Sequence, residues 1–248
     1  MSHFQDYENI YIITTYFDGV SSSKIALKIL SEKQIKFFTA CLIISLKNIR
    51  EQKIIHRDLE FKNVVMDKEN YFNLIDFSFS VDYSNRNNIL LKCNIFRDFT
   101  PPEILNNSEC DYNSDYYRLG YMIFYLVFKK YPWELNKFTN ISVLIDEKNI
   151  NGKYSIELFD FIFKLYKKDI KERLGYNSIY ELINHPWFNG FNWKKLENKK
   201  INSPFNNIRF KRKDIICKAF RKDERMIQNY KKLIMSNSYI KKIKFFKF

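Results

Sequence analysis

Three oxygen-bearing side chains lie near one another in the sequence and could act as a base or bind a metal ion. The segment IIHRDLEFKNVV, residues 54–65, contains Asp58 and, five positions later, Asn63, and Asp76 follows thirteen residues further on. A positioned aspartate can accept the proton of a hydroxyl, and carboxylate and amide oxygens are the ligands that Mg²⁺ prefers. Taken singly, each of these residues is also common in turns at strand ends.

The elements around these residues predict a hairpin that fixes their separation. The runs NVVM and YFNLIDF flank the turn residues 67–70, which favours two short strands. Residues 9–17 are β-branched and aromatic and end at Asp18-Gly19, which predicts another strand and turn.

Over most of the remaining chain, apolar side chains recur at helical spacing, which predicts helices. Ser31 with Gln34 forms a capping box that marks one helix start. Residues 78–100 lack periodicity and predict a long loop. Helices are expected at residues 31–49, 155–166 and 177–183, and a helix buried on all sides at residues 114–130.

Five motifs follow one another in a fixed order along the chain. They are HRDLEFKN with DFS (56–63 and 76–78), TPPE (100–103), DYYRLG (115–120), KKDIKERLG (167–175) and the segment at 184–205. In this order they resemble the catalytic and metal-binding loops, the end of the activation segment and the later helices of eukaryotic protein kinases. The last two motifs resemble the AGC group, which includes the cyclic-nucleotide-dependent kinases. Five ordered motifs are far more specific than any single pattern.

The resemblance implies a serine/threonine kinase that uses ATP and Mg²⁺. Asp58 would accept the proton of the substrate hydroxyl, and Asn63 and Asp76 would hold the metal ion. Glu60 stands where relatives of this group carry a phosphate-binding Lys, and its carboxylate would repel the phosphate. Lys62, two positions on, would take over that role in part.

The resemblance also assigns an adenine pocket. Thr14 would lie at its back, Thr15 and Phe17 would offer backbone groups to the adenine edge, and Val65 would form its apolar floor.

Further residues would have structural roles. Glu103 and Arg173 would form a buried ion pair between the activation segment and a late helix, and Asp115 would anchor the His-Arg-Asp backbone. Surface charges are the alternative for these three. The other structural positions are His56 and Phe77, in the hydrophobic stack between the lobes, and Arg57, which would hold the activation segment or the catalytic aspartate.

The chain departs from the kinase pattern near its start. No two of its five glycines lie within five residues of each other, so no GxGxxG loop exists in it. IALK (25–28) imitates the strand that carries the phosphate-pairing Lys, but only one helix fits between it and His56, so we reject the match. We therefore expect the chain to begin within the last strands of the small lobe.

Other departures concern regulation and substrate choice. Ser78 replaces the Gly of Asp-Phe-Gly and restricts backbone freedom. Leu91 and Ile95 stand where an activating Thr is expected. The positions where basophilic relatives hold acids for substrate arginines read Ser21, Lys62 and Tyr125, which predicts no preference for arginine-rich substrates.

Charge separates the chain into two parts. Residues 194–248 hold 18 Lys/Arg and four Asp/Glu, whereas residues 1–193 hold 24 of each sign. The body is therefore no basic nucleic-acid binder, and that reading of the function is poorly supported. The four scattered cysteines and the lack of a signal peptide or membrane span predict a reduced, cytoplasmic protein, with the nucleus as the alternative.

Together these features predict an α+β protein-kinase-like fold, a mostly helical C-terminal lobe with remnants of the N-lobe sheet. The expected domains are 1–18 (end of the N-lobe and hinge), 19–188 (C-lobe) and 189–248 (basic tail). The expected function is phosphoryl transfer from ATP to protein hydroxyl groups, and the alternative is a pseudokinase that acts as a binding or scaffolding module. The expected partners are a protein substrate and a regulatory subunit or the missing N-lobe segment.

Overall fold

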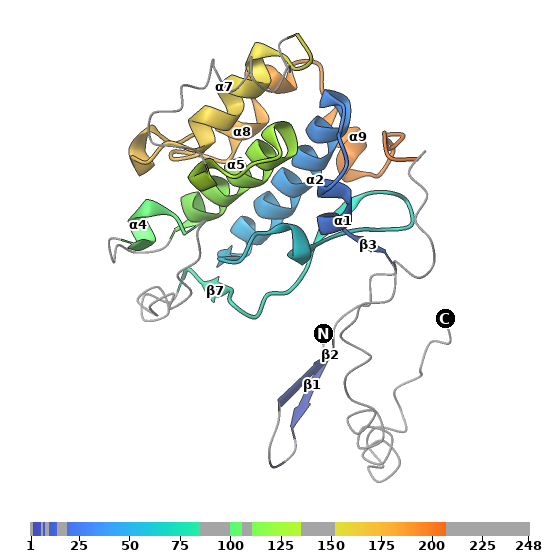
Figure 1. Cartoon of the computed structure of the whole chain (residues 1–248). Helices are drawn as coiled ribbons and strands as arrows, with labels where there is room; N and C mark the ends of the chain where they lie inside the picture. The colour runs from blue at the N-terminus through green and yellow to red at the C-terminus, as the bar shows by residue number, and fades with distance from the viewer. Residues whose placement is uncertain are drawn as a thin grey trace. The chain divides into compact units, whose positions relative to one another are not determined.

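The computed structural model describes residues 2–5, 7, 10–13, 19–84, 100–105, 111–134 and 152–206. Helices predominate over a few short strands, which confirms the predicted α+β class (Figure 1). At the centre, α2 (Glu32–Glu51) lies beside α5 (Tyr112–Phe128), and α7 (Ile156–Leu165) packs on α5.

Helix α2 begins where the sequence predicts. Ser31 Oγ accepts a hydrogen bond from the Gln34 amide, and the Gln34 side chain accepts from the Ser31 amide at 2.9 Å, so the predicted capping box is confirmed. This arrangement satisfies two amides that would otherwise lack partners at the helix start. The buried face of the helix then carries Ile35, Phe38 and Leu42 into the core.

Helix α5 is the buried helix expected from its apolar sequence, although it begins two residues earlier than predicted. Asp111 caps its start by accepting from the Asn113 amide at 2.7 Å. At Gly120 an added Cβ would lie 2.9 Å from Leu165 Cβ, so a glycine there allows α5 and α7 to pack closely.

Among the residues that the structure describes, three small antiparallel sheets accompany the helices. In the three-stranded sheet, β3 (Val20–Ser21) pairs with β5 (Val64–Met66), and β5 pairs with β6 (Phe72–Leu74), which confirms the predicted hairpin. The two-stranded pairs are β4 (Ile54–Ile55) with β7 (Val81–Asp82) and β1 (Ser2–Gln5) with β2 (Ile10–Ile13).

The remaining elements are short. IALK lies in helix α1 and the turn after it rather than in a strand, as expected. The segment 78–100, predicted as loop throughout, contains the short strand β7, and the helix expected at 177–183 is reduced to one turn. The short helices are α1 (Ser22–Ala26), α4 (Pro102–Leu105), α8 (Tyr180–Ile183), α9 (Trp193–Glu197), η1 (Phe61–Asn63), η2 (Pro132–Glu134), η3 (Ile170–Glu172) and η4 (Pro186–Phe188).

The last described residues pack against the β5–β6 hairpin. The Tyr71 hydroxyl donates to the Ile201 carbonyl at 2.6 Å, and Ser203 Oγ donates to the Asn70 carbonyl at 2.9 Å. Phe205 is fully buried, with its ring centroid 4.9 Å from that of Phe72. Within the described part of the chain, no helix is both long and apolar enough to cross a membrane.

Candidate active site

The segment that carries Asp58 is held in place by hydrogen bonds to its backbone amides. The carboxylate of Asp115, on α5, accepts hydrogen bonds from the amides of His56 at 2.8 Å and Arg57 at 2.9 Å. Asp115 is buried, and burial raises the pKa of its carboxyl although the two amides act in the opposite sense. Arg57 has a φ of 64°, a conformation that is costly for a residue with a side chain unless the surroundings hold it.

Both carboxylate oxygens of Asp58 have defined neighbours. Asn63 Nδ2 donates to Asp58 Oδ2 at 2.9 Å and to the Asp58 carbonyl at 2.8 Å. Lys62 Nζ lies 3.7 Å from Oδ2, and Arg118 Nη1 lies 3.6 Å from Oδ1. Asp58 is 1% exposed, so these contacts fix the orientation of a buried carboxylate.

The β5–β6 hairpin places Asp76 beside the Asp58 segment. Val64 faces Leu74 in the register of the two strands, and the Ile75 amide donates to the Asn63 carbonyl at 2.9 Å. Asp76 therefore follows directly after the residue bonded to Asn63. Its backbone has a φ of 63°, and the residue is exposed.

Ser78 contacts Asp76 directly, a contact that the sequence does not predict. Its hydroxyl donates to Asp76 Oδ1 at 2.5 Å and its amide donates to the same oxygen at 3.3 Å. These bonds lower the pKa of Asp76 below its ordinary value, with the hydroxyl as the largest cause. Asp76 is therefore ionised at neutral pH.

Asn63 and Asp76 fit the donor chemistry of Mg²⁺. Asn63 donates with its amide nitrogen, which leaves its amide oxygen for another partner, and Asp76 supplies an ionised carboxylate. Both are hard oxygen ligands, and Mg²⁺ commonly takes only one or two such groups from the protein and completes its shell with water and phosphate. No cluster of three or more His, Cys, Asp or Glu side chains suited to a metal occurs among the described residues.

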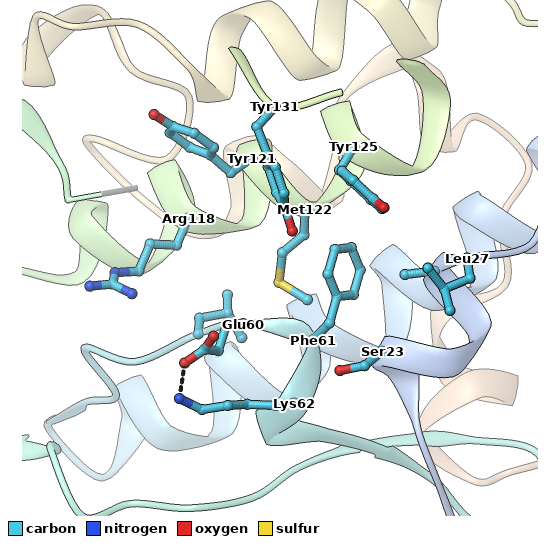
Figure 2. Close-up of a pocket in the computed structure, with 12 residues that line it drawn as sticks. Ser23, Leu27, Glu60, Phe61, Lys62, Arg118, Tyr121, Met122, Tyr125 and Tyr131 are labelled. Carbon is cyan, nitrogen blue, oxygen red and sulfur yellow. Dashed lines mark ion pairs between the residues drawn. The ribbon is translucent and has the colours of Figure 1, made fainter. Parts of the chain in front are cut away.

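Glu60 and Lys62, the two unusual residues of this loop, form an ion pair with each other (Figure 2). The Lys62 side chain is half exposed, while that of Glu60 is mostly buried. The carboxylate that the sequence places near the phosphate position is thus partly neutralised by its neighbour.

Arg118 was not identified from the sequence as a site residue. It lies one turn after Asp115 on the same helix, so α5 presents one side chain to the loop backbone and the other to the Asp58 carboxylate. A second charged residue, one turn after Asp115 in a buried helix, is the signal that could have revealed it, because buried charges are costly unless they are paired.

The pair Glu103 and Arg173 is brought together as the sequence predicts. Arg173 Nη1 and Nη2 donate to the two Glu103 oxygens at 2.7 and 2.8 Å. Arg173 also donates to the carbonyls of Asn113 at 3.0 Å and Lys167 at 3.1 Å. Its side chain is fully buried, so this bidentate pair joins α4, α5 and the segment before η3.

The other predicted residues divide into those with described positions and those without. The rings of His56 and Phe77 lie 5.0 Å apart, edge to face. Arg57 Nε donates to the Phe79 carbonyl at 2.6 Å, so it holds the segment after Asp76. Val65 lies half-buried on β5. The residues that lie outside the described part of the chain are Thr14, Thr15, Phe17, Leu91 and Ile95.

Comparison with known proteins agrees with this geometry. The family model described as the protein kinase domain matches residues 1–188. A probable serine/threonine-protein kinase of Dictyostelium discoideum is 29% identical over 82% of this chain and 45% of its own length. Developmentally-regulated protein kinase 1 of the same organism is 32% identical over 74% of this chain and 26% of its own. The cAMP-dependent protein kinase catalytic subunit of Schizosaccharomyces pombe is 26% identical over 82% of this chain and 40% of its own length.

The chain belongs to the protein kinase domain family. Its relatives include cAMP- and cGMP-dependent kinases, which agrees with the AGC-like character of its motifs. The chain spans less than half the length of the curated relatives described above. Kinase domains in general use ATP with Mg²⁺ and act on protein substrates.

Proposed function

We propose that this chain transfers the γ-phosphoryl group of ATP to serine or threonine hydroxyl groups of proteins, with Asp58 as the base. The observation that carries the proposal is the constraint on Asp58: its backbone segment is bonded to Asp115, and its carboxylate is bonded to Asn63. A base held in one orientation is what phosphoryl transfer needs, since the protein mainly positions the reactants and neutralises charge.

In the proposed reaction, the hydroxyl oxygen of the substrate forms a bond to the γ-phosphorus, and the bond from phosphorus to the ADP oxygen breaks. Asp58 accepts the hydroxyl proton. Asn63 and Asp76 would hold Mg²⁺, which supplies positive charge beside the phosphates. Lys62, within 4 Å of Asp58, would place a further cation near the transferring group.

Further residues are predicted to take part in nucleotide binding. Val65 on β5 would contact the adenine, and Thr14, Thr15 and Phe17 would form the rest of that pocket. A regulatory subunit, or a segment that supplies the phosphate-covering loop, would complete the site. The names of the relatives favour the enzyme over the alternative of a binding module without catalysis.

The test of Asp58 is transfer of ³²P from Mg-ATP to a mixed protein substrate by the full chain. We expect Asp58→Asn to lower the rate about 10²- to 10⁴-fold, the usual contribution of a positioned base. The matched control is Asp160→Asn, which removes a carboxylate on α7 that contacts Lys164 and His185 and lies outside the site. Transfer that Asp58→Asn leaves unchanged would contradict the proposed role.

Nucleotide binding is tested separately by thermal unfolding. A ligand at 100 times its Kd stabilises the folded state by about 2.7 kcal/mol. We expect Mg-ATP to raise the Tm of the wild type and of Asp58→Asn, but much less that of Asp76→Asn. Stabilisation without any transfer would instead favour the binding module.

A further inference from the structure

A cavity of about 260 Å³ opens directly beside the Asp58 segment. Helix α1 contributes Ser23 and Ala26 to its lining, Leu27 follows directly after this helix, and the loop after Asp58 contributes residues 59–62. The opposite wall comes from α5 and the segment after it, with Arg118, Tyr121, Met122, Tyr125 and Tyr131 (Figure 2). We call this cavity the tyrosine-walled pocket.

Aromatic rings form part of the lining of the tyrosine-walled pocket. Tyr125 stacks on Tyr131, with ring centroids 4.5 Å apart and an interplanar angle of 28°. The Phe61 ring centroid lies 5.7 Å from that of Tyr125, and Met122 also lines the pocket, next to Phe61 (Figure 2). Such walls favour an aromatic or large aliphatic guest, since aromatic rings gain from edge and stacking contacts in addition to burial.

The charged side chains of the pocket face charges of opposite sign. Glu60 is paired with Lys62, and Arg118 lies 3.6 Å from the carboxylate of Asp58. A charged guest would have to disturb one of these pairs, whereas an apolar guest would not. The pocket is therefore unsuited to a substrate lysine or arginine, in agreement with the absence of an acid at position 125.

The position of the pocket fixes which residue of a substrate can reach it. Lys62 and Arg118, which line it, lie within 4 Å of the Asp58 carboxylate. In an extended peptide, neighbouring side chains point to opposite faces, so residues two apart share a face. A side chain two positions from the acceptor hydroxyl would therefore point the same way as the hydroxyl.

We propose that the tyrosine-walled pocket selects protein substrates with an aromatic or large aliphatic residue two positions from the phosphorylated serine or threonine. This inference rests on the proposed function for the location of the acceptor. It goes further in naming the substrate class and in naming Tyr125 as a residue that determines specificity.

The test measures binding of fluorescein-labelled peptides to the full chain by fluorescence anisotropy. Each peptide is Ala/Gln-rich with one Ser and carries Phe, Arg, Asp or Ala at one position from three residues before to three residues after it. We expect Phe two positions from Ser to lower Kd at least tenfold relative to Ala, and Arg and Asp to give no such gain. Equal binding of all four residues there, or a preference only at odd positions, would overturn the proposal.

Variants of Tyr125 make the test specific to the pocket. Tyr125→Ala should remove the Phe preference, while Tyr125→Phe keeps the ring and should retain it. Tyr125→Glu introduces a carboxylate on the wall and should shift the preference toward Arg. If Tyr125→Ala binds the Phe peptide as tightly as the wild type does, the pocket is not the binding site.

The same peptides separate this proposal from the proposed function. Phe-dependent binding that Tyr125→Ala removes, without ³²P transfer, would support the pocket and count against catalysis. Transfer to these peptides at equal kcat/KM for Phe and Ala would support catalysis and overturn the pocket. Unfolding midpoints of the variants, which should match the wild type within a few degrees, exclude loss of folding as the cause.

Discussion

Arg173 joins three segments through one fully buried guanidinium group. It binds both oxygens of Glu103 and the carbonyls of Asn113 and Lys167. None of these contacts involves Asp58, so the pair stabilises the scaffold whether or not the site is active.

Removing Glu103 should leave this cation buried without its carboxylate. We expect Glu103→Ala to lower the free energy of unfolding by about 3–5 kcal/mol, the usual cost of breaking a buried pair. The measurement is urea denaturation, with Glu172→Ala as the control because the Glu172 side chain is exposed and forms a surface ion pair with Lys167. The control should stay within about 0.5 kcal/mol of the wild type. A similar small effect for Glu103→Ala would contradict the role assigned to the pair.

At the residue scale, the sequence predicts which two residues contact each other when both belong to known motifs. Asp115 and the His56–Arg57 backbone are such a case, because their spacing matches a known pattern. The Ser78 hydroxyl on Asp76 and the approach of Arg118 to Asp58 could not be predicted. Both depend on the direction in which a side chain points, which the order of residues along the chain does not reveal.

At the scale of the elements, the Glu32 side chain connects α2 with α7 and η4 through hydrogen bonds. Standing at the start of α2, it accepts from the amide and hydroxyl of Ser155, the N-cap of α7, at 2.7 and 2.5 Å. It also accepts from Trp187 Nε1, in η4, at 2.8 Å. Burial alone would raise the pKa of Glu32, but the hydrogen bonds outweigh it and the pKa is lowered.

The hydrogen bonds of Glu32 predict that the stability difference between the wild type and a Glu32 variant depends on pH. A carboxyl with a lowered folded-state pKa stabilises the fold above its ordinary value near 4.5, and the contribution is lost as the pH falls through the folded-state pKa. Glu32→Gln should therefore cost about 1–3 kcal/mol at pH 7 and progressively less below about pH 4.5. Urea denaturation between pH 3 and 7 measures this. The double variant with Ser155→Ala should lose less than the sum of the single variants, and a cost independent of pH would contradict the assignment.

Element prediction succeeds where the signal is local. The capping box lies within one helical turn and the β5–β6 hairpin is formed by two strands joined directly by a turn, and both are found. Strand β7 was missed because two residues carry no periodicity, and it forms only by pairing with β4, nearly thirty residues away.

On the scale of the whole molecule, positive charge is concentrated at one end of the sequence. Residues 207–248 hold 14 Lys/Arg and three Asp/Glu. Long-range electrostatics therefore predicts weak, sequence-independent binding to polyanions that depends on salt.

A matched pair of full-length variants tests where this binding originates. We expect Lys→Gln at positions 241, 242, 244 and 247 to elute from heparin at lower salt than the wild type. Lys→Gln at 164, 167, 168 and 171 removes equal charge from the neutral body and should shift elution far less. Equal shifts for both would show that net charge alone, rather than its location, governs the binding.

The family could be predicted from the sequence because its motifs extend from residue 56 to residue 205 in one order. The tyrosine-walled pocket could not, since its lining comes from α1, the loop after Asp58 and the α5–η2 region, which are distant in sequence. Periodicity indicates that a helix is buried, but it does not show which of its side chains border a cavity.

The anchoring of the Asp58 segment has a consequence for how such a domain can change. Asp115 binds the main-chain amides of His56 and Arg57 rather than their side chains. Every residue except proline has such an amide, so the path of this segment tolerates substitution of the side chains it displays. Replacements such as Glu60 and Lys62 therefore leave the contacts that hold this segment in place, because neither residue takes part in them.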